Sequence, residues 1–420
     1  MGGRVNVGLA SFVAALTASL WAAAAMAQQV PIAPYQSTSR PTDAQKLQMP
    51  LRAPLTILPS VTVSEEYNDN ILLSNRDRRW DIITGITPAV SVILESATYR
   101  LAAGYNFTAE LYERDPDRNA AFNRQNFNGD AQWRPTEQLT LTATDTFAFS
   151  TDTNLISAEG VSTGRDRAWS NTLGGGIAYR ISPLTTVHGA ASYTVQRFNA
   201  SDLQDSDVYR AEVGVDRALT RFLTGTLAYQ VAYFDIDNEP KTWTHTPRIG
   251  FSYRLTETIT IAASGGPTFE LRDGDGGDRV TPAVTARYAQ RVFFGSIGAN
   301  FDRQVSTAGG LGGTTDNTSF GFTVDVTTLL RGLTLSFAPR YSIVKSPDSS
   351  RIDIRSFTLP LTATYRLTAW LAAVASYQFY QQRSDSTIQT STNRFIAEDA
   401  DQNRMFVGLQ FGYPITFDRP

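Results

Sequence analysis

The sequence predicts an all-β fold, a closed antiparallel transmembrane β-barrel of about 18 strands, and three observations lead to this prediction. Apolar and polar residues alternate along most of the chain, connecting segments alternate between short and long, and aromatic residues gather at both ends of the apolar positions. The 420 residues are 42% hydrophobic but lack the repeated runs of about 20 apolar residues that a bundle of membrane helices needs. Aromatic residues at 11% and a net charge of −3 argue against a disordered chain and against a nucleic-acid-binding protein.

The chain begins with a segment typical of a secretory signal peptide. Arg4 supplies an early positive charge, an apolar run follows over 7–25, and Ala25-Met26-Ala27 is a small-x-small cleavage site. We therefore expect cleavage after Ala27, with an uncleaved membrane anchor as the alternative. Residues 28–54 hold five prolines among polar residues and predict an extended periplasmic segment, with a plug as the alternative.

Alternation with a period of two dominates from Leu55 to Phe417. In 223–233, for example, odd positions are mostly large and apolar, and even positions are small or polar. A strand points successive side chains to opposite faces, so each such segment predicts a strand with one apolar and one polar face. The expected strands cover 55–67, 80–94, 97–113, 121–134, 137–150, 167–181, 184–198, 206–218, 221–235, 241–255, 257–271, 279–290, 292–305, 317–330, 332–346, 352–367, 369–384 and 402–417.

The connecting segments predict the topology. Every second connector is tight, as at 95–96, 135–136, 182–183, 219–220, 256–257 and 290–291. The others are longer and more polar, as at 68–79, 151–166, 272–278, 306–316 and 385–401. This asymmetry is typical of bacterial outer-membrane barrels, which have short periplasmic turns and long extracellular loops. We therefore expect residues 55–417 to form one barrel whose first strand starts in the periplasm.

Aromatic residues are expected to form two belts on the outer face, at the two levels of the lipid headgroups. The belt near the short turns comprises Tyr99, Trp133, Tyr179, Phe222, Tyr253, Phe293, Tyr365 and Trp370. The belt near the long loops comprises Tyr112, Trp169, Tyr233, Trp243, Phe269, Phe301, Tyr341 and Phe379. A soluble β-sandwich also alternates, but so many long strands would leave its edges open.

Charged residues on the polar face predict a polar lumen, because a basic side chain facing lipid at mid-depth costs about 2–4 kcal/mol. The expected lumen-lining charges are Glu66, Arg100, Glu110, Arg124, Asp130, Arg210, Glu212, Asp216, Arg248, Glu270, Arg287, Asp302, Asp325 and Arg340. Cross-strand pairs that hold the wall together are the structural interpretation of these residues. Asp145 falls on the apolar face in this register, which indicates a bulge or a different register there.

No motif predicts catalysis. The chain has no cysteine and only two histidines, His188 on the lumen side and His245 at the outer rim. No paired-histidine motif is present, and we expect no enzyme, no cofactor and no metal. An outer-membrane hydrolase remains an alternative, with His188 as its best candidate residue.

The segment Glu65-Glu66-Tyr67-Asn68-Asp69-Asn70 resembles the Glu-x-Tyr-x-Asp-Asn signature of a family of bacterial outer-membrane proteins, the β-barrel porin type 2 family. The Arg76–Arg79 stretch and the strand that follows it are similar too. The resemblance implies a role near exopolysaccharide or capsule synthesis and export. Glu65, Tyr67, Asp69 and Asn70 carry the motif, and they suit either a loop folded back by Asx-type hydrogen bonds or a sugar contact.

The sequence therefore predicts a porin-like protein of the Gram-negative outer membrane, which passes small solutes or assists exopolysaccharide export through a polar lumen. A structural or surface-interaction barrel with a filled lumen is the alternative. Expected partners are membrane lipid and lipopolysaccharide, the barrel assembly machinery through Tyr413 and Phe417, and exopolysaccharide or its export proteins. No nucleic-acid partner is expected.

Overall fold

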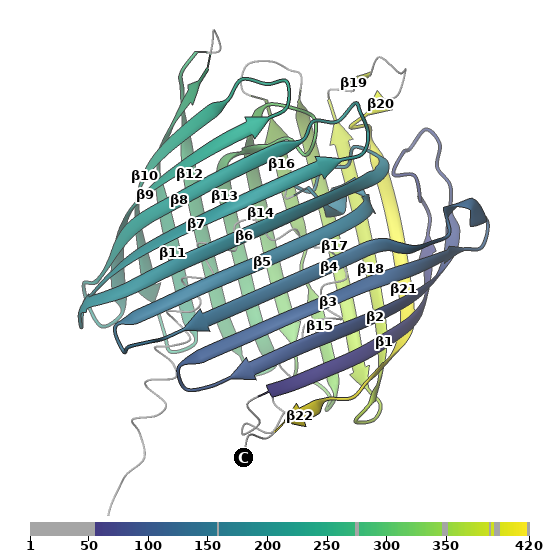
Figure 1. The fold of residues 1–420 in the computed structure, drawn as a ribbon, viewed down its shortest axis with the longest axis horizontal. Helices are drawn as coiled ribbons and strands as arrows, with labels where there is room; N and C mark the ends of the chain where they lie inside the picture. Colours follow the sequence, from purple (N-terminus) through teal and green to yellow (C-terminus); the bar gives the residue numbers. More distant parts are fainter. Residues whose placement is uncertain are drawn as a thin grey trace, which may run out of the picture.

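The computed structural model describes residues 55–417 except 158, 274–276, 347–351, 386–387 and 390–394. The predicted signal peptide with its cleavage after Ala27, and the predicted segment 28–54, lie outside the described residues. Twenty strand segments form one antiparallel sheet, and two of its strands are each interrupted once, so the sheet has 18 strands. The sheet closes because β1 (Leu55–Asn68) pairs with β2 (Asp81–Glu95) on one side and with β21 (Ala400–Gly412) on the other. Figure 1 shows β1 in purple beside β21 in yellow, which confirms the predicted closed barrel.

Between β2 and β21, each strand pairs with the next along the chain, as in a sequence of hairpins. The further strands are β3 (Tyr99–Tyr112), β4 (Ala120–Trp133), β5 (Leu139–Asp152), β6 (Arg165–Ser182), β7 (Thr185–Phe198), β8 (Ser206–Ala218), β9 (Leu223–Ile236), β10 (Thr242–Arg254), β11 (Ile259–Arg272), β12 (Arg279–Val292), β13 (Gly295–Thr307), β14 (Thr314–Val326), β15 (Leu333–Phe337), β16 (Arg340–Lys345), β17 (Asp353–Arg366), β18 (Leu371–Ser384) and β22 (Ile415–Phe417). Connectors at one rim have two to six residues, and those at the other have five to fifteen. These ends are called the short-turn rim and the long-loop rim.

Two expected strands are interrupted, and proline is the cause in both. The strand expected over 332–346 divides into β15 and β16 around Pro339, and the last strand divides into β21 and β22 at Pro414. Proline has no N–H to donate to the neighbouring strand, so it breaks the ladder. The loop before β21 also contains a small hairpin of β19 (Ile388–Gln389) and β20 (Phe395–Ile396) that alternation did not indicate. The described residues also contain two short 3₁₀ helices, η2 (Pro116–Arg118) and η3 (Thr153–Leu155). No helix among these residues is long and apolar enough to cross a membrane.

The two faces follow the predicted alternation, with one exception in the aromatic belts. Tyr112 was expected on the outer face, but it points inward and is 3% exposed. It lies two residues after the inward-facing Glu110, and residues two apart share a face of a strand. Its hydroxyl group donates to Glu110 Oε2 at 2.9 Å, so Tyr112 belongs to the inner wall.

Asp145 lies on the outer face without a bulge or a change of register. The pairing of β5 with β6 runs without a shift from Leu139 to Ser150 and places Asp145 opposite Leu173. Asn171, also on the outer face, donates from Nδ2 to Asp145 Oδ1 at 2.7 Å. A carboxylate and an amide thus form a polar pair on the apolar face near the middle of β5.

Candidate functional site

All fourteen sequence-predicted lumen charges lie on the inner face of the wall, in register with the buried inner-face residues of their own strands. They do not form one group. Glu66, Glu110 and Arg124 meet near the long-loop rim, and Arg100 pairs with Glu95 near the short-turn rim. Asp325 accepts hydrogen bonds from Ser296 and Ser336.

The lumen differs between its two halves. On β18, Tyr380 and Gln382 near the long-loop rim are buried, whereas Ala372 near the short-turn rim is half-buried. On β5, Asp152 is buried and Thr140 is half-buried. The half of the lumen next to the long loops is therefore filled by protein, and the half next to the short turns is open to solvent.

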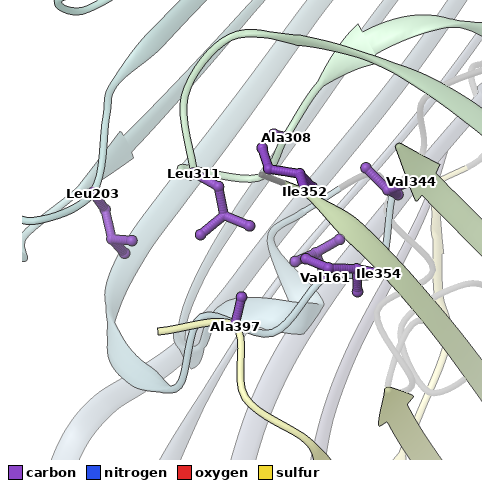
Figure 2. Packing of buried hydrophobic residues seen from close by; sticks show 8 residues of the cluster. All are labelled: Val161, Leu203, Ala308, Leu311, Val344, Ile352, Ile354 and Ala397. Atoms are coloured by element: carbon purple, nitrogen blue, oxygen red, sulfur yellow. The ribbon is translucent and has the colours of Figure 1, made fainter. Parts of the chain in front are cut away.

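Loops from different parts of the chain fill the long-loop half by packing a small apolar core. Figure 2 shows this cluster, whose members come from five of the long connectors and the strand ends beside them. Its buried residues are Val161, Leu203, Ala308, Leu311, Val344, Ile352, Ile354 and Ala397. Burying apolar side chains stabilises the inward position of these loops by roughly 1.5–3 kcal/mol for each fully buried large side chain.

The loop between β5 and β6, residues 156–164, is anchored to a distant strand, β18. Gln382 accepts from the backbone N–H of Ser162 at 2.8 Å and donates to the Ser162 carbonyl oxygen at 2.9 Å. The hydroxyl group of Tyr380 donates to the carbonyl oxygen of Gly160 at 2.9 Å. Burial raises the pKa of Glu159 in this loop, and a 2.8 Å hydrogen bond from Ser157 acts in the opposite direction.

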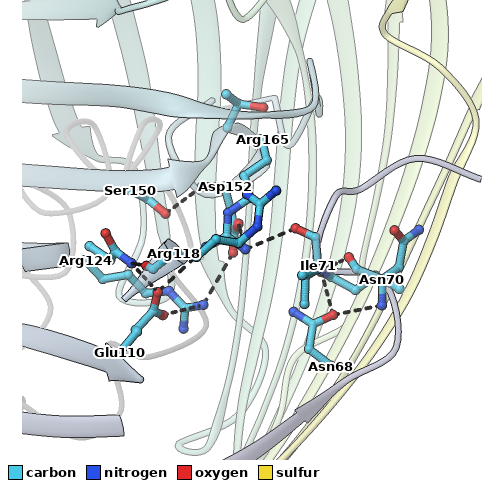
Figure 3. A network of polar contacts seen from close by, with 12 residues as sticks. Asn68, Asn70, Ile71, Glu110, Arg118, Arg124, Ser150, Asp152 and Arg165 are labelled. Atoms are coloured by element: carbon cyan, nitrogen blue, oxygen red, sulfur yellow. Dashed lines mark hydrogen bonds and ion pairs between the residues drawn. The ribbon is translucent and has the colours of Figure 1, made fainter. Parts of the chain in front are cut away.

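Six buried charged residues form an ion cluster beneath this loop, part of which Figure 3 shows. Its members are Glu66, Glu110, Asp152, Arg124, Arg165 and Arg404, each with a side chain at most 7% exposed. Arg404 holds Glu66 through two bonds of 2.7 and 3.0 Å and reaches Asp152 at 3.2 Å. Arg124 Nη2 lies 2.9 Å from Glu110.

The ion cluster joins the wall to the loops. Three acids face three arginines, so its formal charges cancel. Arg165 also donates from Nη1 to the carbonyl oxygen of Ile71 at 3.0 Å and from Nη2 to the Tyr112 hydroxyl group. Sequence reasoning missed Asp152, Arg165 and Arg404 as site residues. Arg404 lies at an even, inner-face position within the expected strand 402–417, and extending the alternation of the expected strand 137–150 by two residues would have found Asp152.

Arginines on the far side of the lumen are arranged differently. Arg210, Arg248, Arg287 and Arg340 come from four different strands, and the charge of Asp302 interacts with all four. Among the contacts of the described residues, no hydrogen bond or ion pair within 4.0 Å joins Asp302 to Arg210, Arg248 or Arg340. Glu159 adds a second acid from the β5–β6 loop and interacts electrostatically with Arg210 and Arg340.

Two further charged groups lie on the inner wall. Near the long-loop rim, Glu270 is fully buried between Arg272 and Arg279, at 2.7 Å from each. His188 faces the lumen beside two acids, with Nδ1 2.9 Å from Asp216 and Nε2 3.8 Å from Glu212. These contacts stabilise the wall, and no group of three or more His, Cys, Asp or Glu in the described part of the chain has the arrangement of a metal site.

The family-motif residues secure the seam between the first and last strands. Asp69 accepts from the backbone N–H and the side-chain amide of Asn403 on β21, both at 2.7 Å. Asn70 is fully buried and donates to the Asp401 carbonyl oxygen at 2.9 Å. Asn70 N–H also donates to Asn68 Oδ1 at 3.0 Å in an Asx-type turn.

The first two motif residues have a different position. Glu65 and Tyr67 lie on the outer face, where Glu65 accepts from Thr84 Oγ1 at 2.9 Å and the Tyr67 ring lies 6.1 Å from that of Trp80. A cavity of about 270 Å³ lies near the seam, between the first three long connectors and the last one. Its lining is Leu72, Leu73, Ser74, Arg118, Thr163, Gly164, Arg165, Ala397 and Glu398.

Comparisons with known proteins find one family match and several similar solved structures. The family model of the autotransporter β-domain matches residues 292–419, whereas no curated protein matches the chain. Among solved structures, Pseudomonas aeruginosa OpdL is 11% identical, with a TM-score of 0.42 over 85% of this chain and 99% of that one. Acinetobacter baumannii OccAB4 is 9% identical, with a TM-score of 0.44 over 87% and 99% of the two chains. The closed barrel, its apolar outer face and the β-domain match together indicate that this chain is an outer-membrane β-barrel protein.

Proposed function

We propose that the protein is a porin-like channel, through which small polar solutes diffuse across the outer membrane. The short-turn rim then faces the periplasm, and the long-loop rim faces the outside. The observation that carries this proposal is the charged inner wall, which solvent reaches over the short-turn half of the lumen. Charged groups are favourable on such a wall only beside water, polar solutes or opposite charges.

In this proposal the β5–β6 loop is the barrier to passage. A solute passes from the open half of the lumen to the outside only when residues 156–164 leave their bonds to Gln382 and Tyr380. Loops that move in this way typically do so within microseconds to milliseconds. The expected behaviour is therefore a small conductance that fluctuates between a closed and an open level.

Conductance across a planar lipid bilayer tests the proposal. We expect the double variant Tyr380→Phe, Gln382→Ala to raise the open fraction, because it removes three of the bonds that hold the loop. Gln381→Ala is the matched control, since Gln381 lies on the opposite face of the same strand. If neither the wild type nor the double variant conducts, the channel proposal is wrong.

A structural or surface-interaction barrel is the second candidate, and the packed long-loop half of the lumen favours it. Replacing residues 156–164 by a short Gly-Ser linker separates the two candidates. A channel gains a steady conductance from this change. A barrel that is closed by its wall charges gains none, although it still inserts into the bilayer.

Assistance of exopolysaccharide export is the version of the proposal that the family resemblance suggests. A polymer needs a wider opening than a small solute, so all the loops of the apolar cluster would have to move outward. The amount of polysaccharide on the surface of cells that lack this chain tests this version. An unchanged amount restricts the proposal to small solutes.

A further inference from the structure

We propose that the inner wall carries a binding site for small oxyanions, formed by Arg210, Arg248 and Arg340. Its ligands would be solutes with a carboxylate, sulfate or phosphate group. This inference deepens the proposed channel function by naming the class of solute that the channel favours. The inference rests on the proposed function only for the passage of the anion through the barrel. Binding itself requires only that the anion reach the arginines from the open half of the lumen.

The first argument is that these arginines have buried donor atoms without acceptors. Nη1 and Nη2 of Arg210, Nε of Arg248 and Nε of Arg340 are all buried, and each has no hydrogen-bond partner among the described residues. Arg248 is only 7% exposed as a whole. A buried charged donor without an acceptor is unfavourable, and a guanidinium group offers paired N–H donors that match the two oxygens of an oxyanion.

The second argument is the contrast with the ion cluster on the other side of the lumen. There, Arg404 holds Glu66 with two bonds and also reaches Asp152, so its charge is compensated by contact. Asp302 has no comparable bond to Arg210 or Arg248, although their charges interact. The acid lowers the repulsion between the arginines without occupying their donor atoms.

The third argument is the balance of charge. The three proposed ligands share the region with Asp302 and Glu159, which leaves a formal charge of +1. Burial raises the pKa of Glu159, which favours its neutral form and increases this excess. The excess is local, since the full chain has a net charge of −3, and a local excess in a water-accessible wall attracts anions.

The fourth argument is that the site has space and a rigid support. The cross-strand neighbour of Arg210 on β9 is Ala232, and that of Arg248 is Ala228, so small side chains flank both guanidinium groups. Arg210 lies over the ring of Phe234, with Cζ 5.3 Å from the ring centroid. This contact positions the guanidinium group and leaves its N–H edge available for a ligand.

The direct test is titration of the full-length protein in neutral detergent and Tris buffer with sulfate and, separately, with succinate, followed by calorimetry. We expect binding of at least one of these anions, and we expect Arg248→Gln to weaken it by about tenfold or more. Arg100→Gln is the matched control, because Arg100 is also a lumen arginine but pairs with Glu95 at 3.2 Å. Absence of binding by both anions, or equal weakening in the two variants, would overturn the inference.

A variant with the opposite expected effect excludes misfolding as an explanation. Asp302→Asn removes the competing acid, so we expect tighter anion binding and, in a KCl gradient across a bilayer, a greater preference for chloride. A loss of anion binding in Asp302→Asn would contradict the inference. The two proposals can fail separately: anion binding without conductance refutes the channel, and conductance without anion binding or anion preference refutes the oxyanion site.

Discussion

Replacing Arg404 by alanine should destabilise the barrel far more than replacing Arg100, although both arginines form ion pairs on the inner wall. The side chain of Arg404 is 3% exposed, and those of its partners Glu66 and Asp152 are 5% and 2% exposed. Breaking a buried pair leaves a buried charge without compensation and costs about 3–5 kcal/mol. Arg100 and Glu95 are 50% and 56% exposed, and such a pair contributes about 0–1 kcal/mol.

Urea unfolding in phospholipid vesicles, followed by tryptophan fluorescence, measures this difference. We expect the free energy of unfolding to fall by at least about 2 kcal/mol more in Arg404→Ala than in Arg100→Ala. A similar small loss in both variants would refute the reasoning. It would mean that water reaches the ion cluster and screens it as it screens a surface pair.

The double variant Glu66→Ala, Arg404→Ala tests the cause of the loss. It removes one acid and one base, so two acids and two arginines remain and the formal charges still cancel. If the unpaired acid causes the loss, the double variant is less destabilised than the sum of the single variants. The expected coupling is about 0.5–3 kcal/mol, and strict additivity would show that lost packing explains the effect instead.

Three further predictions concern the loop, the seam and the outer face. Gln382→Ala should expose residues 156–164 to protease in detergent, because two bonds to Ser162 are lost, and unchanged cleavage would show that apolar packing alone holds the loop. Asp69→Ala should lower the free energy of unfolding by about 1–3 kcal/mol, since two amide donors of Asn403 lose their acceptor; equal stability would refute a role in the seam. Asp145→Leu should raise the free energy of unfolding in vesicles by up to about 1 kcal/mol, because an acid on the lipid face is unfavourable, and a decrease would show that its hydrogen bond from Asn171 outweighs this cost.

Most of the barrel could be predicted because alternation is a local signal that acts over every strand. Shifting the register by one residue moves every side chain to the other face, so a charged residue among apolar neighbours already indicates which face is inside. Tyr112 shows the limit of using residue type alone, since its aromatic ring suggested the lipid belt while the position of Glu110 placed it inside. Pro339 and Pro414 interrupted strands at points where the alternation itself continued.

The packing of the loop core and the pairing within the ion cluster were not predictable, because their contacts join segments far apart in the sequence. Ser162 and Gln382 are separated by 220 residues, and Glu66 and Arg404 by 338. Long connectors have no periodicity that indicates whether they fold outward or into the lumen. Apolar residues within the long connectors, such as Val161, Leu203 and Leu311, are a signal in the sequence that favours an inward position.

The arrangement of arginines separates those that stabilise the wall from those available to a solute. A charged side chain that only stabilises the wall is most stable in direct contact with its partner and away from water. Arg404 and Glu66 have this arrangement, with 2.7 Å between Arg404 Nε and Glu66 Oε1. Arg248 has lost most of its solvent contact without gaining such a partner, which costs stability that a purely structural wall need not lose. Asp302 lies on the same wall and shares its field with Arg210, Arg248 and Arg340 rather than pairing with one, so their buried donor atoms require oxygen acceptors that the described residues do not supply. An oxyanion from the water-accessible half of the lumen meets this requirement, because each guanidinium group offers N–H donors to its oxygen atoms.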